Sequence, residues 1–238
     1  MPKPTPPNYI AGTPGDDILD ISANTADYTV DGRAGDDTIT GGSGHDSLLG
    51  GRGNDLINAW IDDALIDGGS GVDTASFAGF SDISGSGVDA RLLGGLLGLE
   101  GGILQANVFT GIENLIGSDY DDYLGGNRSV NRLDGGAGDD LLHAQGAGDF
   151  LTGGTGADTF EVTSVSRTVT VTDFHYNDGD RIKIEGGAEF NWVNGSRPDA
   201  DGSLQPAWIG TCDLQFGGTL EVVILGADTS PSTDWIIG

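Results

Sequence analysis

Apolar side chains recur every nine residues along two long stretches of the chain. From Gly32 five units read GRAGDDTIT, GGSGHDSLL, GGRGNDLIN, AWIDDALID and GGSGVDTAS, and five more from Gly117 read GSDYDDYLG, GNRSVNRLD, GGAGDDLLH, AQGAGDFLT and GGTGADTFE. The eighth position of every unit is apolar: Ile39, Leu48, Ile57, Ile66, Ala75, Leu124, Leu133, Leu142, Leu151 and Phe160. A further unit, GTPGDDILD from Gly12, precedes the first block in a slipped register. A flexible glycine–aspartate linker has no reason to keep this spacing, so the pattern predicts a structural repeat.

Each unit combines a turn with a very short strand. Glycine with aspartate favours a tight turn, and the polar–apolar–polar triplet after it predicts a strand with one inward side chain. Because one unit has nothing to bury that side chain against, two units would form an 18-residue coil, and stacked coils would share a narrow core. The sequence therefore predicts an all-β fold, a solenoid of short strands in two blocks, 12–76 and 117–161.

The remaining residues fall into three segments. Residues 1–11 form an N-terminal tail, and residues 77–116 interrupt the repeat until aliphatic residues resume at Ile112. This bridging segment predicts either a pair of longer strands covering the roll, or an exposed apolar loop, Leu92–Leu104, that binds a partner. Residues 162–238 predict an antiparallel β cap with short strands. These strands are expected at Phe190–Val193, Leu214–Phe216 and Leu220–Leu225.

Composition narrows the classes of protein. The 238 residues include 43 Gly and 37 Asp plus Glu against 10 Lys plus Arg, a formal charge of −27. This charge disfavours nucleic acid and anionic membranes as partners. The single Cys212 excludes an internal disulfide. The longest Leu-rich stretch is too short and too broken for a transmembrane segment, and the N-terminus has no apolar core typical of a signal peptide. So acidic a chain stays disordered unless something neutralises it.

The acidic residues follow the repeat. Position 6 of the units is Asp except at Ala64 and Asn131. An 18-residue coil would stack Asp37, Asp55 and Asp73 along one edge, and Asp122, Asp140 and Asp158 in the same way in the second block. Stacked like charges repel, and a hard cation held by carboxylate and carbonyl oxygens removes that repulsion. Such ligands suit Ca²⁺ better than Mg²⁺, and the three scattered His residues argue against zinc.

These units resemble the G-G-x-G-x-D-x-U-x repeat of RTX (repeats-in-toxin, hemolysin-type calcium-binding) proteins. The resemblance implies a parallel β-roll with Ca²⁺ between the turns of adjacent coils. One turn would supply carbonyls from positions 2 and 4 and Asp at 6, and the turn 18 residues on would supply carbonyls from positions 1 and 3 and its own Asp. It assigns as ligands Arg33, Gly35, Asp37, Gly50, Gly51, Arg52, Gly53, Asp55, Gly68, Ser70 and Asp73, and then Asp122, Gly135, Gly136, Ala137, Gly138, Asp140, Gly153, Thr155 and Asp158.

Further ligands are expected on the opposite edges and at the ends. Asp17 belongs to the slipped unit. Asp46 faces the unit that has Ala64 at position 6, where Asp62 or Asp63 would replace the missing aspartate. Asp149 faces Asn131, whose neutral oxygen is the expected ligand. Together these pairings imply several Ca²⁺ ions, about six.

The C-terminal part resembles the segment that closes the rolls of serralysin-type proteases. Asp173-Phe174 and Asp180, followed by Ile182 and Ile184, match its D-F…D-x-I pattern, which implies that the two Asp residues bind a last Ca²⁺. From the residues alone, a plain β-hairpin turning at 177–179 is the alternative. The final residues, Asp-Trp-Ile-Ile-Gly, resemble an uncleaved type I secretion signal, and an ordinary edge strand is the alternative there.

No catalytic residues are expected, because the sequence has neither H-E-x-x-H nor G-x-S-x-G. The leading hypothesis is a secreted, extracellular calcium-binding β-roll protein that leaves the cell through a type I secretion exporter and folds on binding Ca²⁺. One alternative is a module or enzyme acting on an acidic extracellular polysaccharide such as alginate. The other is a surface-layer or adhesive protein that assembles through the Leu92–Leu104 segment.

Overall fold

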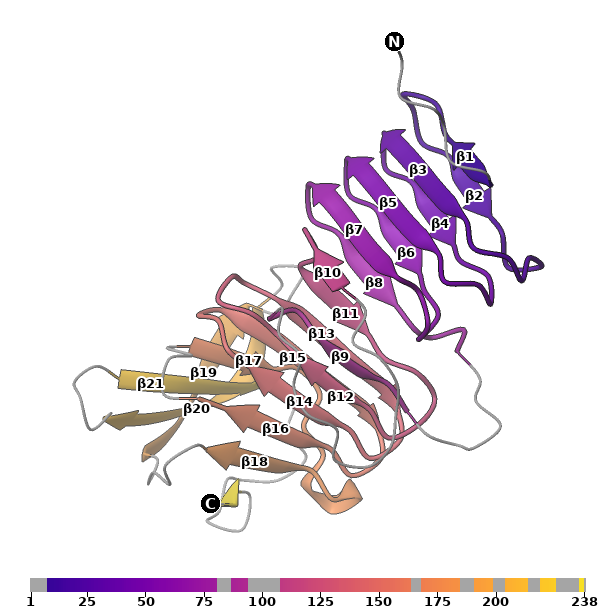
Figure 1. The fold of residues 1–238 in the computed structure, drawn as a ribbon. Helices are drawn as coiled ribbons and strands as arrows, with labels where there is room; N and C mark the ends of the chain where they lie inside the picture. The colour runs from indigo at the N-terminus through magenta and orange to yellow at the C-terminus, as the bar shows by residue number, and fades with distance from the viewer. Residues whose placement is uncertain are drawn as a thin grey trace.

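Parallel strands wound into a two-layer roll make up most of the chain (Figure 1). The computed structural model describes residues 8–80, 87–93, 108–163, 168–184, 191–198, 204–213, 219–225 and 236–237. Their strands form three sheets of 5, 11 and 6 strands, which we call sheets A, B and C. One helix is described, the three-residue 3-10 helix η1 (Tyr176–Asp178), so no described helix is long enough to cross a bilayer.

Within each sheet, strand pairing follows the roll from its N-terminal end to its C-terminal end. Sheet A contains β1 (Tyr9–Ala11), β3 (Thr29–Ala34), β5 (Ser47–Arg52), β7 (Leu65–Ser70) and β10 (Val108–Thr110). Sheet B contains β2 (Ile18–Asp20), β4 (Thr38–Thr40), β6 (Leu56–Asn58), β8 (Thr74–Ser76), β11 (Asn114–Ile116), β13 (Arg132–Ala137), β15 (Asp149–Thr155), β17 (Thr168–Val171), β21 (Thr219–Leu225), β20 (Leu204–Asp213) and β19 (Asn191–Pro198). Sheet C contains β9 (Asp89–Arg91), β12 (Tyr123–Gly125), β14 (Leu141–Ala144), β16 (Thr159–Val162), β18 (Arg181–Ile184) and β22 (Ile236–Ile237).

Sheet B runs through both blocks and forms one layer of the whole roll. In the first block the chain passes alternately between sheets A and B, and in the second block it passes alternately between sheets B and C. The inward side chains of sheet B stay aligned across the junction, because Ala75 of β8 pairs with Leu115 of β11. Since aligned residues of parallel strands point to the same side, sheets A and C share the second layer (Figure 1).

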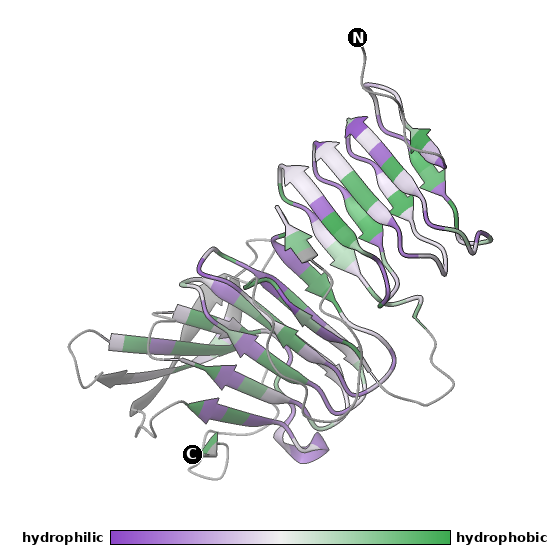
Figure 2. Ribbon diagram, in the orientation of Figure 1, coloured by the Kyte–Doolittle hydropathy of each residue, from purple (hydrophilic) through white to green (hydrophobic). Residues whose placement is uncertain are grey.

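The predicted 18-residue coil is confirmed by the strand register. Ser47 pairs with Leu65 in sheet A, Leu56 with Thr74 in sheet B, and Tyr123 with Leu141 in sheet C. The ten apolar residues at position 8 are all fully buried in one continuous core: Ile39, Leu48, Ile57, Ile66, Ala75, Leu124, Leu133, Leu142, Leu151 and Phe160. Figure 2 shows green, hydrophobic bands on the strands of the roll, with white or purple positions near them.

The close approach of successive turns explains the glycines of the repeat. Gly53 has φ +130°, a conformation that side chains with a Cβ rarely adopt. A Cβ there would also lie 2.6 Å from the carbonyl carbon of Gly35 in the preceding coil. Neighbouring turns are therefore in backbone-to-backbone contact, with no room for side chains between them.

The bridging segment changes which sheet faces sheet B. Strand β9 pairs with β12 and begins sheet C, while β10 pairs with β7 and ends sheet A. The described strands of this segment, β9, β10 and β11, have three residues each and extend the sheets. The coil restarts at Ile112 and Leu115, both buried, as predicted. Residues 94–107, and with them most of the Leu92–Leu104 loop, lie outside the described part.

The roll continues beyond the repeats before an antiparallel sheet ends it. Strand β17 pairs in parallel with β15, and β18 pairs in parallel with β16, so the hairpin alternative around 177–179 is wrong. Strand β21 then adds to β17, and β20 pairs antiparallel with β19 and β21, which confirms the expected antiparallel region. The predicted strand Leu214–Phe216 lies outside the described residues.

Candidate calcium centre

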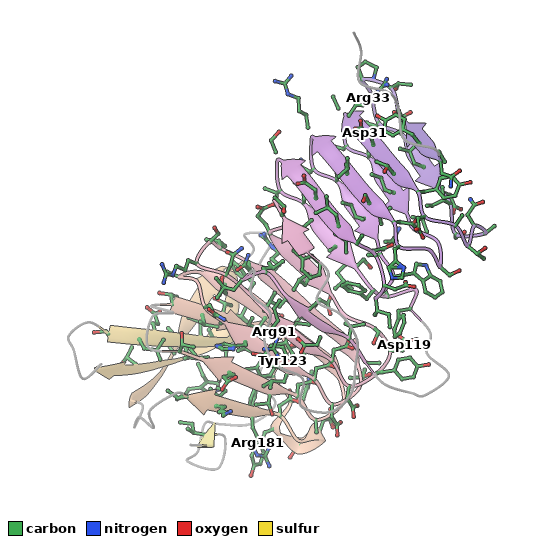
Figure 3. The ribbon with its side chains drawn as sticks, in the orientation of Figure 1. Asp31, Arg33, Arg91, Asp119, Tyr123 and Arg181 are labelled. Atoms are coloured by element: carbon green, nitrogen blue, oxygen red, sulfur yellow. The ribbon has the colours of Figure 1, made fainter. Side chains whose placement is uncertain are left out.

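The turns of the roll line two edges, one on each side of sheet B. We call the turns that lead into sheet B strands the first edge, and the turns that lead out of them the second edge. Asp37, Asp55 and Asp73 precede β4, β6 and β8 on the first edge. Asp140 and Asp158 precede β14 and β16 on the second edge. The two rows of stacked aspartates predicted from the repeat thus lie on opposite edges. In Figure 3, the label Arg33 marks the first edge and the label Asp119 marks the second edge.

One oxygen of each stacked aspartate holds the adjacent coil. The backbone N–H of Asp37 donates to Oδ1 of Asp55 at 2.8 Å, and the N–H of Asp55 donates to Oδ1 of Asp73 at 2.7 Å. On the second edge the N–H of Asp140 donates to Oδ1 of Asp158 at 3.0 Å. These bonds give every carboxylate a fixed orientation.

The other oxygen of the same aspartates has no partner. Five such Oδ2 atoms are buried without a hydrogen bond, those of Asp37, Asp55, Asp73, Asp140 and Asp158. The five residues are at most 2% exposed. A buried carboxylate oxygen without a donor is costly, so a bound cation is the natural complement.

Backbone carbonyls converge on these free oxygens. A Cβ built on Gly32 would clash with Oδ2 of Asp37 and lie 2.7 Å from the carbonyl oxygen of Gly50. A Cβ built on Gly135 would clash with Oδ2 of Asp140 and lie 2.6 Å from the carbonyl oxygen of Gly153. Carboxylate and carbonyl oxygens from two turns therefore face a common small space, which is the donor set that Ca²⁺ prefers.

The other predicted carbonyl ligands lie in the same turns. The carbonyls at positions 2 and 4 contact the turn of the next coil. A Cβ built on the glycine 18 residues later would clash with each of these carbonyl oxygens, which belong to Arg33, Gly35, Gly51, Gly53, Gly136 and Gly138. Carbonyls at position 3 accept N–H groups of the preceding coil: Arg52 from Gly35, Ser70 from Gly53 and Thr155 from Gly138. Ala137 pairs with Thr155 in the same register.

Aspartates elsewhere on the edges are already hydrogen-bonded through both oxygens. Oδ2 of Asp46 accepts the N–H of Gly42 at 2.9 Å, and Oδ1 accepts the N–H of Tyr28. Oδ2 of Asp149 accepts the N–H of Gly146 at 2.9 Å, and Oδ1 accepts the N–H of Asn131. Asp46 and Asp149, on the edge of each block opposite to the free Oδ2 atoms, are thus closed by the protein itself.

Two predicted ligands at the block ends also accept hydrogen bonds on their Oδ2 atoms. Oδ2 of Asp17 accepts the N–H and hydroxyl of Thr13. Oδ2 of Asp122 accepts the N–H of Ser118 at 2.5 Å, and its Oδ1 accepts the Ser118 hydroxyl at 2.8 Å. Both aspartates still stack in register, because their N–H groups donate to Oδ1 of Asp37 and Asp140.

The unit without a consensus aspartate buries a neighbouring one. Asp63 is 3% exposed next to Ala64, and its Oδ2 accepts the N–H of Trp60 at 2.7 Å. Its Oδ1 is buried without a partner. Of the two substitutes considered for position 64, Asp63 is the one that is buried, while Asp62 stays half-buried.

Asp173 and Asp180 both lie between β17 and β18, next to the turn of the last repeat. Oδ1 of Asp180 accepts the N–H of Asp158 at 3.0 Å, so Asp180 continues the second-edge file. Both oxygens of Asp173 accept N–H groups, from Gly153 at 2.9 Å and Gly154 at 2.8 Å. The structure brings both residues to the turn of Asp158, although their oxygens are largely occupied.

In the metal-free fold, nothing neutralises the negative charge of the buried carboxylates that have a free oxygen. Burial, opposed in part by backbone hydrogen bonds, raises the pKa of Asp73 to about 6 and those of Asp140 and Asp158 to about 7, and neighbouring carboxylates add to the rise. Burial raises the pKa of Asp63 to about 8. Without a cation, these carboxyls therefore bind protons at a higher pH than an exposed aspartate does.

Without metal, the fold is expected to be more stable at about pH 5 than at about pH 8. The pKa values of these carboxyls are higher in the fold than in the unfolded chain, where they are about 3.9. Their stabilising contribution is therefore complete below about pH 4 and is lost as the pH rises through about 6–8. Circular dichroism in resin-treated, metal-free buffer measures this. A metal-free β signal that rises with pH over that range would contradict it.

A second polar ladder lies next to the position-6 aspartates and was missed by sequence reasoning. At position 5, Oδ1 of Asp36 accepts the N–H of Asn54 at 2.7 Å, and Oδ1 of Asn54 accepts the N–H of Val72 at 2.9 Å. Oδ1 of Asp139 accepts the N–H of Ala157 at 2.8 Å. The frequent Asp or Asn at position 5 was the available signal.

Three cations on sheet C are engaged within the chain. Arg91 pairs with Asp89 at 2.6 Å and stacks 4.0 Å from the Tyr123 ring centre (Figure 3). Nζ of Lys183 lies 2.8 Å from Oε1 of Glu161, and the Arg181 guanidinium lies 4.6 Å from the centre of the Tyr176 ring. A basic surface for an acidic polysaccharide therefore gains no support from this sheet.

The candidate site is rich in backbone oxygens and poor in side chains. Within the described ranges, no three His, Cys, Asp or Glu side chains gather around one point. A cation at either edge would thus take one or two carboxylates and several carbonyls. Such ligands fit Ca²⁺ and do not fit metals that prefer imidazole or thiolate.

Comparison with known proteins agrees with this chemistry. The model of the RTX calcium-binding nonapeptide repeat matches four times, at residues 29–57, 42–75, 109–142 and 125–160. No curated protein matches the sequence. Among solved structures, the chain is similar to the extracellular lipase LipA from Serratia marcescens, with 17% identity and a TM-score of 0.24, over 99% of this chain and 40% of the lipase. The chain therefore carries RTX calcium-binding nonapeptide repeats along 29–75 and 109–160, less than half of its length.

Proposed function

We propose that this chain is a secreted calcium-binding β-roll protein whose folding is coupled to Ca²⁺ binding outside the cell. One observation carries the proposal. Five buried aspartate oxygens without hydrogen-bond partners recur at the same position of the repeat, each in a turn that the next coil approaches. The ligands proposed are these five carboxylates with the carbonyls of their own and the following turns.

Bound Ca²⁺ supplies positive charge at the free oxygens. The protein holds those oxygens in place, since each carboxylate is fixed by the N–H of the preceding coil. Because the unfolded chain has no such arrangement, the free energy of binding becomes free energy of folding. Extracellular modules of this chemistry bind Ca²⁺ with dissociation constants of about 10⁻⁴–10⁻³ M, so the roll would fill outside the cell and stay empty in a calcium-poor cytosol.

Export through a type I exporter forms part of the proposal. An acidic chain with a thin core stays unfolded without Ca²⁺, which keeps it threadable through a narrow exporter. The RTX repeats support this route, because type I export is typical of RTX proteins. The C-terminal Asp-Trp-Ile-Ile-Gly sequence would serve as the secretion signal, and its Ile236–Ile237 pairs with β18 at the edge of sheet C.

The proposal is tested by counting bound ions. Isothermal titration of the metal-free protein with CaCl₂ is expected to show several ions, about six, with much weaker binding of Mg²⁺, which demands stricter octahedral geometry. The control is the same titration in urea, where the edges do not exist. Absence of Ca²⁺ binding at millimolar concentrations, or equal binding of both ions, would overturn the proposal.

A further inference from the structure

The first-edge file does not end at Asp73, the last aspartate of the first block. Asn114 pairs in register with Thr74, so Glu113 occupies the next place after Asp73. The N–H of Asp73 donates to Oε2 of Glu113 at 2.9 Å, as the N–H of Asp55 donates to Asp73. In return the carbonyl of Asp73 accepts the N–H of Glu113 at 3.1 Å. The Glu113 carboxylate therefore accepts the bond that a position-6 aspartate accepts, although Glu113 lies in the bridging segment.

A shorter turn explains why this residue is a glutamate. Asp67 of β7 pairs with Thr110 of β10, and Thr74 of β8 pairs with Asn114 of β11. Between these points the repeat has residues 68–73, whereas the bridging segment has only 111–113. The bridging turn is three residues shorter, and the side chain of Glu113 is one methylene longer than that of an aspartate, which lengthens the reach of its carboxylate to the N–H of Asp73.

The oxygens of a cation site are present at this junction. Oδ2 of Asp73 is buried without a partner in a residue that is 0% exposed. A Cβ built on Gly68 would clash with the carbonyl oxygen of Gly111. In the two preceding turns, a Cβ built on the equivalent glycine, Gly32 or Gly50, lies 2.7 Å from the carbonyl of the next turn. The Gly111 carbonyl thus takes the place that a repeat carbonyl takes elsewhere.

We infer that Asp73, Gly111 and Glu113 form a Ca²⁺ site that joins the two blocks across the break in the repeat. Two carboxylates and a carbonyl are hard oxygen donors, which suit this ion. Ca²⁺ at this junction would tie β8 to β11, the strand of sheet B that comes from the bridging segment. This inference rests on the proposed function and extends it to Gly111 and Glu113 of the bridging segment.

The test compares Glu113→Gln with Asp67→Asn. Glutamine keeps an oxygen for the N–H of Asp73 and removes only the charge, so we expect one Ca²⁺ fewer per chain than in the wild type. Asp67→Asn is the matched control. The Asp67 carboxylate is close enough to Asp73 to raise its pKa, so this variant also removes a negative charge near the site. Asp67 itself lies in strand β7, where it pairs with Thr110, and is not one of the proposed ligands. We expect Asp67→Asn to bind the wild-type number of ions. The readout is equilibrium dialysis against ⁴⁵Ca²⁺, independent of any activity.

The outcomes separate the inference from the proposed function. If the wild type binds no Ca²⁺, the proposed function fails. If the wild type binds Ca²⁺ and Glu113→Gln binds the same number with the same affinity, the junction site is wrong. If Glu113→Gln does not fold in Ca²⁺, then Glu113→Asp decides: its carboxylate is one methylene short, so losing one ion supports the site and keeping the full number overturns it.

Discussion

In excess EGTA at neutral pH, the chain is expected to lose most of its β structure, and returning Ca²⁺ is expected to restore it. Five buried carboxylate oxygens lack partners, and burial raises the pKa values of their carboxyls. The core of the roll is a narrow stripe of mostly aliphatic residues, so it has little stability with which to offset this buried charge. Far-UV circular dichroism during a Ca²⁺ titration measures the recovery, with a midpoint of about 10⁻⁴–10⁻³ M.

Mg²⁺ is the control for this experiment, because it screens charge as Ca²⁺ does but fits the carbonyl-rich edge poorly. We expect Mg²⁺ at the same concentration to leave the chain largely unfolded. A β spectrum that is unchanged by the chelator would show that the roll needs no cation, and it would refute the coupling of folding to Ca²⁺.

Asp55→Asn is expected to weaken calcium-dependent folding about tenfold, which corresponds to about 1.4 kcal/mol. Asp55 lies in the middle of the first-edge file. Its Oδ1 accepts the N–H of Asp37, and its Oδ2 is free. Asparagine keeps the acceptor and replaces the free anionic oxygen by an N–H₂ group, so the variant should bind fewer ions. In EGTA the same change removes a buried charge and should not destabilise the chain.

Asp149→Asn is the matched variant on the closed edge. Both oxygens of Asp149 accept backbone N–H groups, from Asn131 on one side and from Gln145 and Gly146 on the other. The amide loses one acceptor and leaves buried donors unpaired, at a cost of about 1–3 kcal/mol. We expect lower thermal stability in saturating Ca²⁺ with no change in ion number. Equal losses of bound Ca²⁺ in the two variants would contradict the distinction between the edges.

Position 8 and position 6 of the repeat were readable from the sequence because both follow a strict local period. Ile39, Leu48 and Ile57 are buried as the period predicts, and Asp37 and Asp55 stack 18 residues apart. The second ladder at position 5 was missed because Asp and Asn there alternate with Val and Ala, which hides the pattern in single units.

The partners of each carboxylate were not readable in the same way. Asp55 and Asp149 occupy the same position of the unit, but only Asp55 has a free oxygen. The difference arises from the turn that each aspartate closes, because the N–H groups of residues 145 and 146 point at Asp149. Such orientation depends on backbone angles that residue type alone leaves open.

The sequence by itself determined the coil: its length, its inward residues, its acidic edges and its preference for Ca²⁺, since all of these repeat every nine or eighteen residues. The tertiary structure alone decided how the two blocks join. The bridging segment ends sheet A with β10, begins sheet C with β9 and leaves sheet B unbroken, so the free carboxylates change from one edge to the other. That outcome depends on pairing between residues 40 positions apart, Thr74 with Asn114, which no local period encodes.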